Sequence, residues 1–190
     1  MHRKPPTTWQ KIARRIRVPV GFIFTALYLW LARPTWESII SGSLFVILGL
    51  AIRISASGHL RKNEELATGG PYAYTRNPLY LASLILALGF AIASRSWWVA
   101  ALLVLIFAAI YMPVIQAEEV FLRTRFPGFA DYAAAVPRIL PKLTQYQHAS
   151  GSFSWDLYFK HREYNSALGS AALIAALVGK LLWFLHRRAP

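Results

Sequence analysis

The sequence predicts an all-α fold, a polytopic integral membrane bundle of about five transmembrane helices, and three observations lead to it. Of the 190 residues, 56% are hydrophobic, and they gather into long runs with few charges. The 21 Lys and Arg residues outnumber the 8 Asp and Glu residues and concentrate in alternate segments between those runs. Tryptophans stand at the ends of several runs, where amphipathic rings favour a membrane interface. An ordinary soluble domain is neither so apolar nor so basic.

Five apolar runs qualify as membrane spans or come close, because a span needs roughly 17 to 25 mostly apolar residues. The clearest is 97–117, which carries no charge. The others are 18–32, 39–52, 78–93 and 167–185, and Lys180 interrupts the last. Short spans are tolerated in a bundle when flanking side chains reach the interface or the bilayer thins. The run 18–32 has no small-residue cleavage site after it, so we expect a retained first span rather than a signal peptide.

The distribution of Lys and Arg predicts the orientation of these helices. Six precede the first run, four lie in the second connection and six in the fourth, whereas the first and third connections hold one each. Because basic residues stay on the cytoplasmic side, we expect the N-terminus to lie in the cytoplasm. The membrane is expected to be a bacterial or archaeal inner membrane. Arg187 and Arg188 conflict with five spans, so the last run is alternatively a surface segment or one that turns back.

The composition narrows the classes of partner and chemistry. There is no cysteine, so neither a disulfide framework nor thiolate chemistry is available, and no metal site is predicted. The net charge of +13 is expected to meet anionic lipid headgroups, especially at residues 1–17, and not nucleic acid. The oligomeric state is left open.

The chain is expected to form a single membrane domain, 1–190, in three parts: an N-terminal segment and first hairpin (1–52), a core (53–141), and an interfacial segment with the last helix (142–190). The hairpin 78–115 turns at residues 94–96, which brings the polar segments on both sides of it to one membrane face. In the third part, Trp155, Tyr158, Phe159 and Arg162 fall at helical spacing. That spacing favours an interfacial helix, although a loop with exposed aromatics fits equally.

The most informative polar segment is 69–80 (GGPYAYTRNPLY), which leads into the apolar run 78–93. Pro78 suits the first turn of a helix. A helix N-terminus presents unpaired N–H groups and partial positive charge, which suits a carboxylate or phosphate. Alternatively, the three tyrosines form an interfacial aromatic belt.

Four of the eight acidic residues form two adjacent pairs, Glu64-Glu65 and Glu118-Glu119. The second pair ends the uncharged run 97–117, where an acid near hydrocarbon needs a partner. Glu119 and Arg123 stand four apart, in the favourable order for a helical ion pair. That pair explains Glu119 without any function, while Glu118 lies elsewhere on the helix.

A third cluster, 136–141 (VPRILP) with Tyr132, combines prolines with Arg138, and alone it indicates a proline-bounded turn. Together and in this order, the three clusters resemble the isoprenylcysteine carboxyl methyltransferase and phospholipid methyltransferase superfamily. The resemblance covers 53–141. Members of that superfamily are integral membrane enzymes that use S-adenosylmethionine to methylate a lipid-borne group at the cytoplasmic face.

The resemblance implies a cytoplasm-facing cofactor pocket and roles for particular residues. The stretch 64–67 and Tyr72 wall the cofactor, 77–80 contact its amino acid end, and Glu118 accepts hydrogen bonds from it. The implied cofactor-binding residues are Glu64, Glu65, Leu66, Ala67, Tyr72, Asn77, Pro78, Leu79, Tyr80 and Glu118, and the candidate catalytic residues are Glu119 and Arg138. Carboxylates suit the cofactor's hydroxyls, and tyrosine faces attract a sulfonium.

The implied substrate is a small lipid-like or isoprenoid molecule that enters from the bilayer, with a carboxylate or an amine as the methyl acceptor. Eukaryotic prenylcysteine enzymes usually have histidine where this chain has Asn77. They also tend to place an arginine, thought to meet the substrate carboxylate, where this chain has Val114. Arg138 is a candidate replacement, and an amine would need Glu118 or Glu119 as a base. Two other classes remain open: a non-catalytic membrane scaffold, and a membrane reductase that uses a nicotinamide cofactor.

Overall fold

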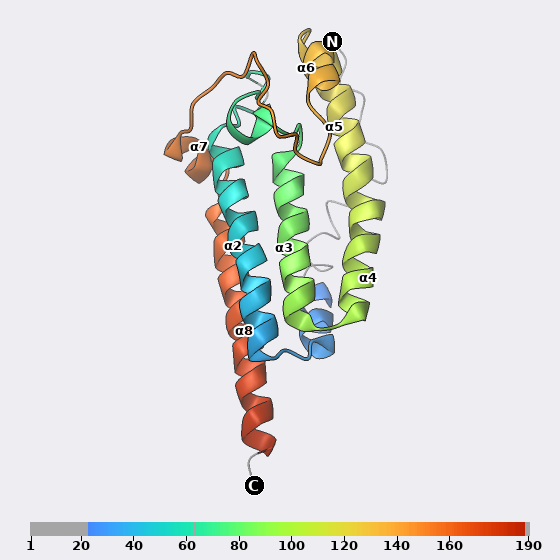
Figure 1. Cartoon of the computed structure of the whole chain (residues 1–190), viewed down its shortest axis with the longest axis vertical. Coiled ribbons are helices and arrows are strands. Elements are labelled where there is room, and N and C mark those ends of the chain that lie inside the picture. The colour runs from blue at the N-terminus through green and yellow to red at the C-terminus, as the bar shows by residue number, and fades with distance from the viewer. Residues whose placement is uncertain (1–22, 63, 189–190) are drawn as a thin grey trace.

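The computed structural model describes residues 23–62 and 64–188, and within them the chain is helical with no strand. The helices, labelled in Figure 1, are α2 (Trp36–Gly58), α3 (Pro78–Ser94), α4 (Trp97–Ile106), α5 (Met112–Arg125), α6 (Phe129–Ala135), α7 (Trp155–Lys160) and α8 (Tyr164–Arg188). A short 3₁₀ helix, Gly70–Ala73, precedes α3, and a π-helical turn, Phe107–Tyr111, joins α4 to α5. The prediction of an all-α fold is confirmed.

Among the described residues, three helices are long and apolar enough to cross a membrane: α2, the continuous helix Trp97–Arg125, and α8. Helix α3 is apolar but shorter. The expected first span, 18–32, lies partly outside the described residues, and its described part is helical over 23–31. Integration into a membrane is therefore supported, while the count of five spans and the orientation stay predictions.

Helices α2 and α3 pack very closely because glycines face each other across the contact. A Cβ added at Gly42 would lie 2.4 Å from the carbonyl oxygen of Gly89, and one added at Gly89 would lie 2.7 Å from that of Gly42. Small residues allow helix backbones to approach in this way inside membranes. Ser38 adds a hydrogen bond from its hydroxyl to the Ala93 carbonyl, 3.1 Å. This pair forms one firm wall of the bundle.

The continuous helix Trp97–Arg125 is irregular in the middle, where sequence alone suggested one uninterrupted span. Pro113 lies in the first turn of α5. Proline has no N–H to donate and its ring clashes with the carbonyl four residues earlier. The π-helical turn Phe107–Tyr111 lies directly before α5, where it accommodates that defect.

Lys180, which interrupts the last apolar run, has a structural explanation. Its ammonium group donates hydrogen bonds to the carbonyls of Trp30 at 3.2 Å and Ala32 at 2.7 Å, and also to that of Leu29. Carbonyls at a helix C-terminus lack intrahelical partners, so Lys180 satisfies the end of the helical residues 23–31. Helix α8 runs beside α2 and extends past the α3–α4 turn (Figure 1).

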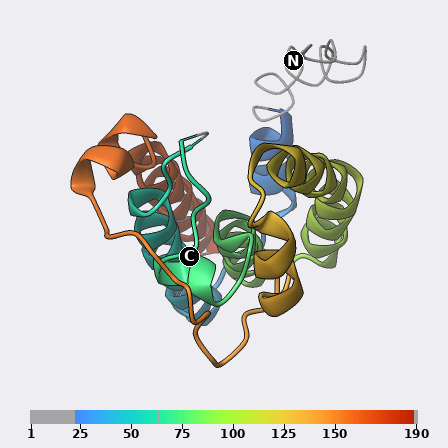
Figure 2. The ribbon, with the colours of Figure 1, turned by 90° about the horizontal axis from the view of Figure 1, so that it is seen from above.

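We call the end of the bundle where α2 ends and α3 begins the polar end. There the connections fold over the helices, as Figure 2 shows from above. Three backbone hydrogen bonds tie the segment before α3 to the segment after α6: Arg76 N–H to Pro137 O, Lys142 N–H to Tyr74 O, and Tyr146 N–H to Ala73 O, at 2.9, 3.0 and 3.1 Å. The first and third sequence clusters are thereby joined.

A small apolar core underlies this joint. Phe129, Tyr132 and Val136 are buried there, with Leu66 and Leu122 packed against them. Beyond it, Trp155, Tyr158 and Phe159 belong to α7, so the helix expected there is present, while its place at a membrane interface stays a prediction. Arg162 lies after the helix in the left-handed region, with φ 55°.

Candidate functional site at the polar end

A cavity of about 560 Å³ opens between the α2–α3 wall and the α5–α6 wall at the polar end. Ligand pockets in proteins are typically about 300–1,000 Å³, so the size suits a small molecule or cofactor. Ten of the residues singled out from the sequence line it: Glu65, Leu66, Ala67, Tyr72, Asn77, Pro78, Leu79, Tyr80, Glu118 and Glu119. The structure therefore brings together two segments that lie about forty residues apart.

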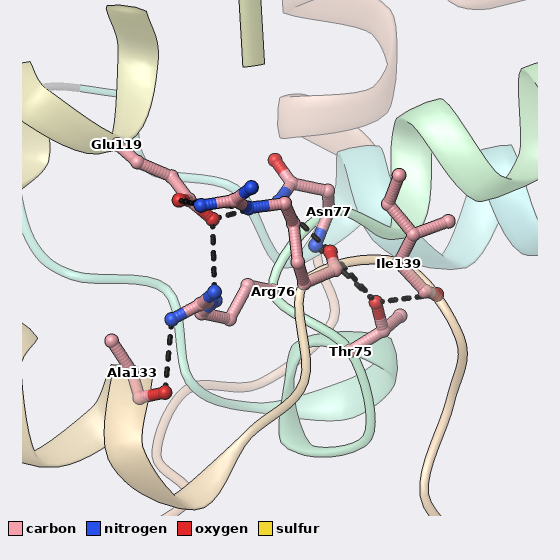
Figure 3. Close-up of polar contacts among 7 residues, drawn as sticks. Thr75, Arg76, Asn77, Glu119, Ala133 and Ile139 are labelled. Carbon is pink, nitrogen blue, oxygen red and sulfur yellow. Dashed lines mark hydrogen bonds and ion pairs between the residues drawn. The ribbon is translucent and has the colours of Figure 1, made fainter. Parts of the chain in front are cut away.

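Glu119 is the centre of an ion-pair network beside the N-terminus of α3, drawn in Figure 3. One carboxylate oxygen pairs with Arg76 Nη2 at 3.2 Å. The other accepts from Arg138 Nη2 at 2.8 Å and Nε at 3.0 Å. The Glu119 side chain is only 12% exposed, and a buried carboxylate needs such partners.

The helical pair of Glu119 with Arg123 is not the arrangement found. Arg123 instead lies over the Phe129 ring, 5.9 Å from its centroid. Although Arg123 has the favourable four-residue spacing, the Glu119 carboxylate pairs instead with Arg76 and Arg138, which come from other segments. Glu119 and Arg138 form an ion pair with each other, which gives both residues a structural role. Their catalytic roles stay predictions.

The segment just before α3 is held by hydrogen bonds to backbone carbonyls of α6 and of the segment that follows it. The Thr75 hydroxyl donates to Ile139 O at 2.9 Å, and Arg76 Nη1 donates to Ala133 O at 2.9 Å (Figure 3). Asn77 precedes Pro78, the first residue of α3. Its amide donates to Arg138 O at 2.9 Å and reaches Glu119 at 3.5 Å, so here the amide acts as a fixed donor.

Glu118 differs from its neighbour, because among the described residues no cation pairs with it. Its carboxylate accepts a hydrogen bond from the Tyr80 hydroxyl at 3.0 Å. Tyr80 in turn packs edge-on against Tyr111, with centroids 5.9 Å apart, and both tyrosines line the cavity. A carboxylate without a countercharge beside two aromatic rings offers a position for a cationic or hydroxyl-bearing ligand.

Tyr72 forms part of the cavity wall and is buried. Burial raises the pKa of its hydroxyl, and the nearby carboxylates of Glu118 and Glu163 raise it further, so Tyr72 stays neutral. The Tyr132 hydroxyl donates to the Tyr72 carbonyl at 2.7 Å. Burial also raises the pKa of the Tyr132 hydroxyl, and the positive charge of Arg76 offsets part of that rise.

Two of the residues singled out from the sequence do not line the cavity. Glu64 is exposed and lies 3.6 Å from Lys160 Nζ. Arg138 contacts the site through the pair of its side chain with Glu119 and through its carbonyl, which accepts from Asn77. Glu65 does line the cavity and also pairs with Arg61 at 3.2 Å. The cofactor-binding role of the 64–67 stretch thus has geometric support only from Glu65, Leu66 and Ala67.

The cavity-lining residues that sequence reasoning missed include Arg53, Ser83, Tyr111 and Glu163. A signal existed for Arg53, because a charge inside an apolar helix is costly and marks a function by default. It was hidden by ending the span at residue 52, while α2 continues to Gly58. No local pattern marked Glu163, which reaches the cavity from the turn before α8.

The described helices and this cavity indicate a helical membrane protein with a pocket at one end of its bundle. The profile of the phospholipid methyltransferase family matches residues 20–128, and the chain belongs to that family. The resemblance seen in the three sequence clusters is confirmed.

Two curated relatives carry names connected with metal resistance. The cobalt-zinc-cadmium resistance protein CzcN of Cupriavidus metallidurans is 34% identical over 160 residues, which cover 80% of this chain and 72% of the relative. The nickel-cobalt-cadmium resistance protein NccN of Alcaligenes xylosoxydans xylosoxydans is 33% identical over 156 residues, 74% of this chain and 72% of the relative. No solved structure matches this chain significantly.

Proposed function

We propose that this protein is an S-adenosylmethionine-dependent methyltransferase that acts on a small lipid-like or isoprenoid substrate at the cytoplasmic face of the membrane. The observation that carries the proposal is Glu118. It is a carboxylate with no cationic partner among the described residues, held by Tyr80, facing a cavity of about 560 Å³. Membership of the phospholipid methyltransferase family supplies the reaction class.

The residues of the cavity fit this cofactor by their chemistry. S-adenosylmethionine would supply a methyl group activated by a positively charged sulfur. Glu118 offers acceptor oxygens for its hydroxyl or ammonium groups, and Tyr80 and Tyr111 offer aromatic faces to a cation. Leu66 and Ala67 provide apolar wall, which suits a nucleobase. The N-terminus of α3 adds partial positive charge that suits a carboxylate.

The chain's contribution to methyl transfer is expected to be positioning and the exclusion of water. The ion-pair network of Glu119 fixes the entrance to α3 and therefore the placement of Tyr80. A carboxylate acceptor would need no base, whereas an ammonium acceptor would first lose a proton, with Glu118 as the candidate base. The resemblance and the family support both kinds of acceptor.

Cofactor binding to the purified full-length chain tests the proposal. We expect wild type to bind S-adenosylmethionine, and Glu118→Ala to weaken binding about 10- to 100-fold, as for loss of a hydrogen bond to a charged group. Glu37→Ala is the matched control, since Glu37 lies in the first turn of α2, at the opposite end of that helix. No detectable affinity in wild type at millimolar cofactor would refute the enzyme in favour of a scaffold. Binding of a nicotinamide cofactor in its place would favour the reductase.

Substrate identity requires a transfer assay. Labelled S-adenosylmethionine incubated with the protein and fractionated bacterial lipids should yield one labelled lipid-soluble product. The names of the relatives suggest a cellular readout: metal tolerance of a deletion strain complemented with wild type or with Glu118→Ala. If the proposed activity serves resistance, the variant fails to complement. Complementation by Glu118→Ala would separate resistance from methyl transfer.

A further inference from the structure

The cavity has a second polar position, deeper than the one around Glu118. Three residues line the cavity at intervals of three: Asn77, which directly precedes α3, and Tyr80 and Ser83, which lie within it. They contact three different charged residues, which are Glu119, Glu118 and Arg53. At 1.5 Å of rise per residue, Ser83 lies about 9 Å further along α3 than Asn77. The third pair therefore lies within the apolar part of the bundle.

Arg53 is the charged group of this deeper position and lies within α2, which is apolar enough to span a membrane. Its Nε and Nη2 donate to Glu163 Oε2 at 2.8 and 2.7 Å, and its Nη1 donates to the Ser83 hydroxyl at 2.8 Å. The side chains of Arg53 and Glu163 are 19% and 15% exposed. Three of the five guanidinium N–H groups are thus used, and the group is aligned by two neighbouring elements.

Glu163 holds Arg53 in an unusual way. Both arginine nitrogens share one carboxylate oxygen, whereas a fully engaged arginine–carboxylate pair uses two parallel bonds. Glu163 belongs to the turn between α7 and α8, directly after Arg162 with its φ of 55°, a conformation that costs a non-glycine residue free energy. It also lies outside 20–128, the segment shared with the family.

The other arginines at the cavity are committed elsewhere. Arg76, which lines the cavity, and Arg138, which lies outside its lining, both pair with Glu119. Arg53 is therefore the arginine lining the cavity whose carboxylate partner comes from a surface turn. Replacing that carboxylate by the anion of a ligand would leave the charge balance at Arg53 unchanged, whereas a cationic headgroup would meet an uncompensated guanidinium.

We propose that Arg53 and Ser83 form a binding site for the anionic headgroup of the acceptor lipid, and that the Glu163 carboxylate occupies this site until the acceptor displaces it. The inference rests on the proposed function, because it assigns the acceptor end of the same cavity. It makes the acceptor an amphiphile with a carboxylate or phosphate headgroup and an apolar tail that lies along the bilayer.

Opposite effects of two substitutions test the proposal. In the full chain in nanodiscs, equilibrium binding of labelled palmitate, lysophosphatidic acid and hexadecylamine is measured for wild type, Arg53→Gln, Glu163→Ala and Glu163→Gln. Loss of the competing carboxylate should tighten anion binding at least about fivefold in both Glu163 variants, since the competent state is then fully populated. Arg53→Gln should weaken it at least about tenfold. Arg53→Lys, which keeps the charge but loses the planar fork, should fall between.

Every result decides the question. Palmitate binding alone identifies a carboxylate headgroup, and lysophosphatidic acid binding identifies a phosphate; both support the site if the Glu163 variants bind more tightly. Weaker or unchanged anion binding in Glu163→Gln, or preference for hexadecylamine, would show a merely structural ion pair. Glu163→Gln removes the charge and keeps the size of the side chain, so it tests the proposal even if Glu163→Ala does not fold. S-adenosylmethionine affinity in the same samples shows separately whether the proposed function stands.

Discussion

The two walls of the cavity are built differently. The α2–α3 wall is packed backbone to backbone through Gly42 and Gly89. The facing helix, Trp97–Arg125, has a π-helical turn near its centre and is less buried within the bundle than α2. It meets the first wall at the polar end through side-chain bonds, chiefly those of Glu118 and Glu119. The closely packed α2–α3 wall thus positions residues that line the cavity, while the facing helix is held to it by the bonds of Glu118 and Glu119.

The largest expected effect comes from breaking the contact between the two walls. Glu119→Ala leaves Arg76, 13% exposed, without its countercharge, and breaking a buried ion pair costs about 3–5 kcal/mol. Thermal unfolding in detergent should show the loss. Glu118→Ala, the adjacent control, should unfold near the wild-type temperature because Glu118 pairs with no cation among the described residues. Equal losses in both variants would contradict the division of roles between the two acids.

The next effect tests the firm wall. Gly42→Leu places side-chain atoms where the Gly89 carbonyl lies, and such overpacking typically costs about 1–3 kcal/mol. Gly179→Leu in α8 is the matched control, since no atom lies within 4 Å of its added Cβ. Denaturant titration of both variants measures the difference. If Gly42→Leu were as stable as the control, the close packing of α2 on α3 would be wrong.

A smaller effect concerns the bond between the walls at the proposed cofactor position. Tyr80→Phe removes the hydroxyl that donates a hydrogen bond to the Glu118 carboxylate at 3.0 Å and keeps the ring. We expect S-adenosylmethionine affinity to fall by about 0.5–1.5 kcal/mol, with little change in stability. Tyr111→Phe serves as the control, because Tyr111 meets Tyr80 through its ring. An equal loss in both would indicate that aromatic polarity, not the orientation of Glu118, sets affinity.

The smallest effect separates the observed network from the helical pair suggested by spacing. Arg123→Ala should change the free energy of unfolding by less than about 0.5 kcal/mol, since Arg123 lies over Phe129 and not on Glu119. Arg76→Ala, measured alongside, should cost several times more. A cost for Arg123→Ala that matches Arg76→Ala would restore the helical pair as the partner of Glu119.

Sequence patterns anticipated most of the fold and much of the cavity for a physical reason. Hydropathy and helix-start chemistry act within a few residues, so the helix that starts at Pro78 and the turn at Arg95 follow directly from the chain. The three polar clusters were expected at one membrane face because a hairpin returns the chain to its starting side. The structure places ten of the twelve residues singled out along one cavity, although their binding roles stay predictions.

The remaining features depended on partners distant in the chain. The choice of Glu119 between Arg123 and the distant Arg76 and Arg138 was decided by which cations the fold brings to a poorly solvated carboxylate. The pairing of Arg53 with Glu163 joins residues 110 positions apart, and no local pattern encodes it.

The sequence by itself determined a basic, apolar, helical membrane protein of the methyltransferase family with a tyrosine-rich polar end, because hydropathy, charge and capping are properties of neighbouring residues. Only the tertiary structure decided which acids are neutralised and which remain available to a ligand. The free energy of a buried charge depends on the groups packed around it, and those groups come from helices that sequence order does not place together.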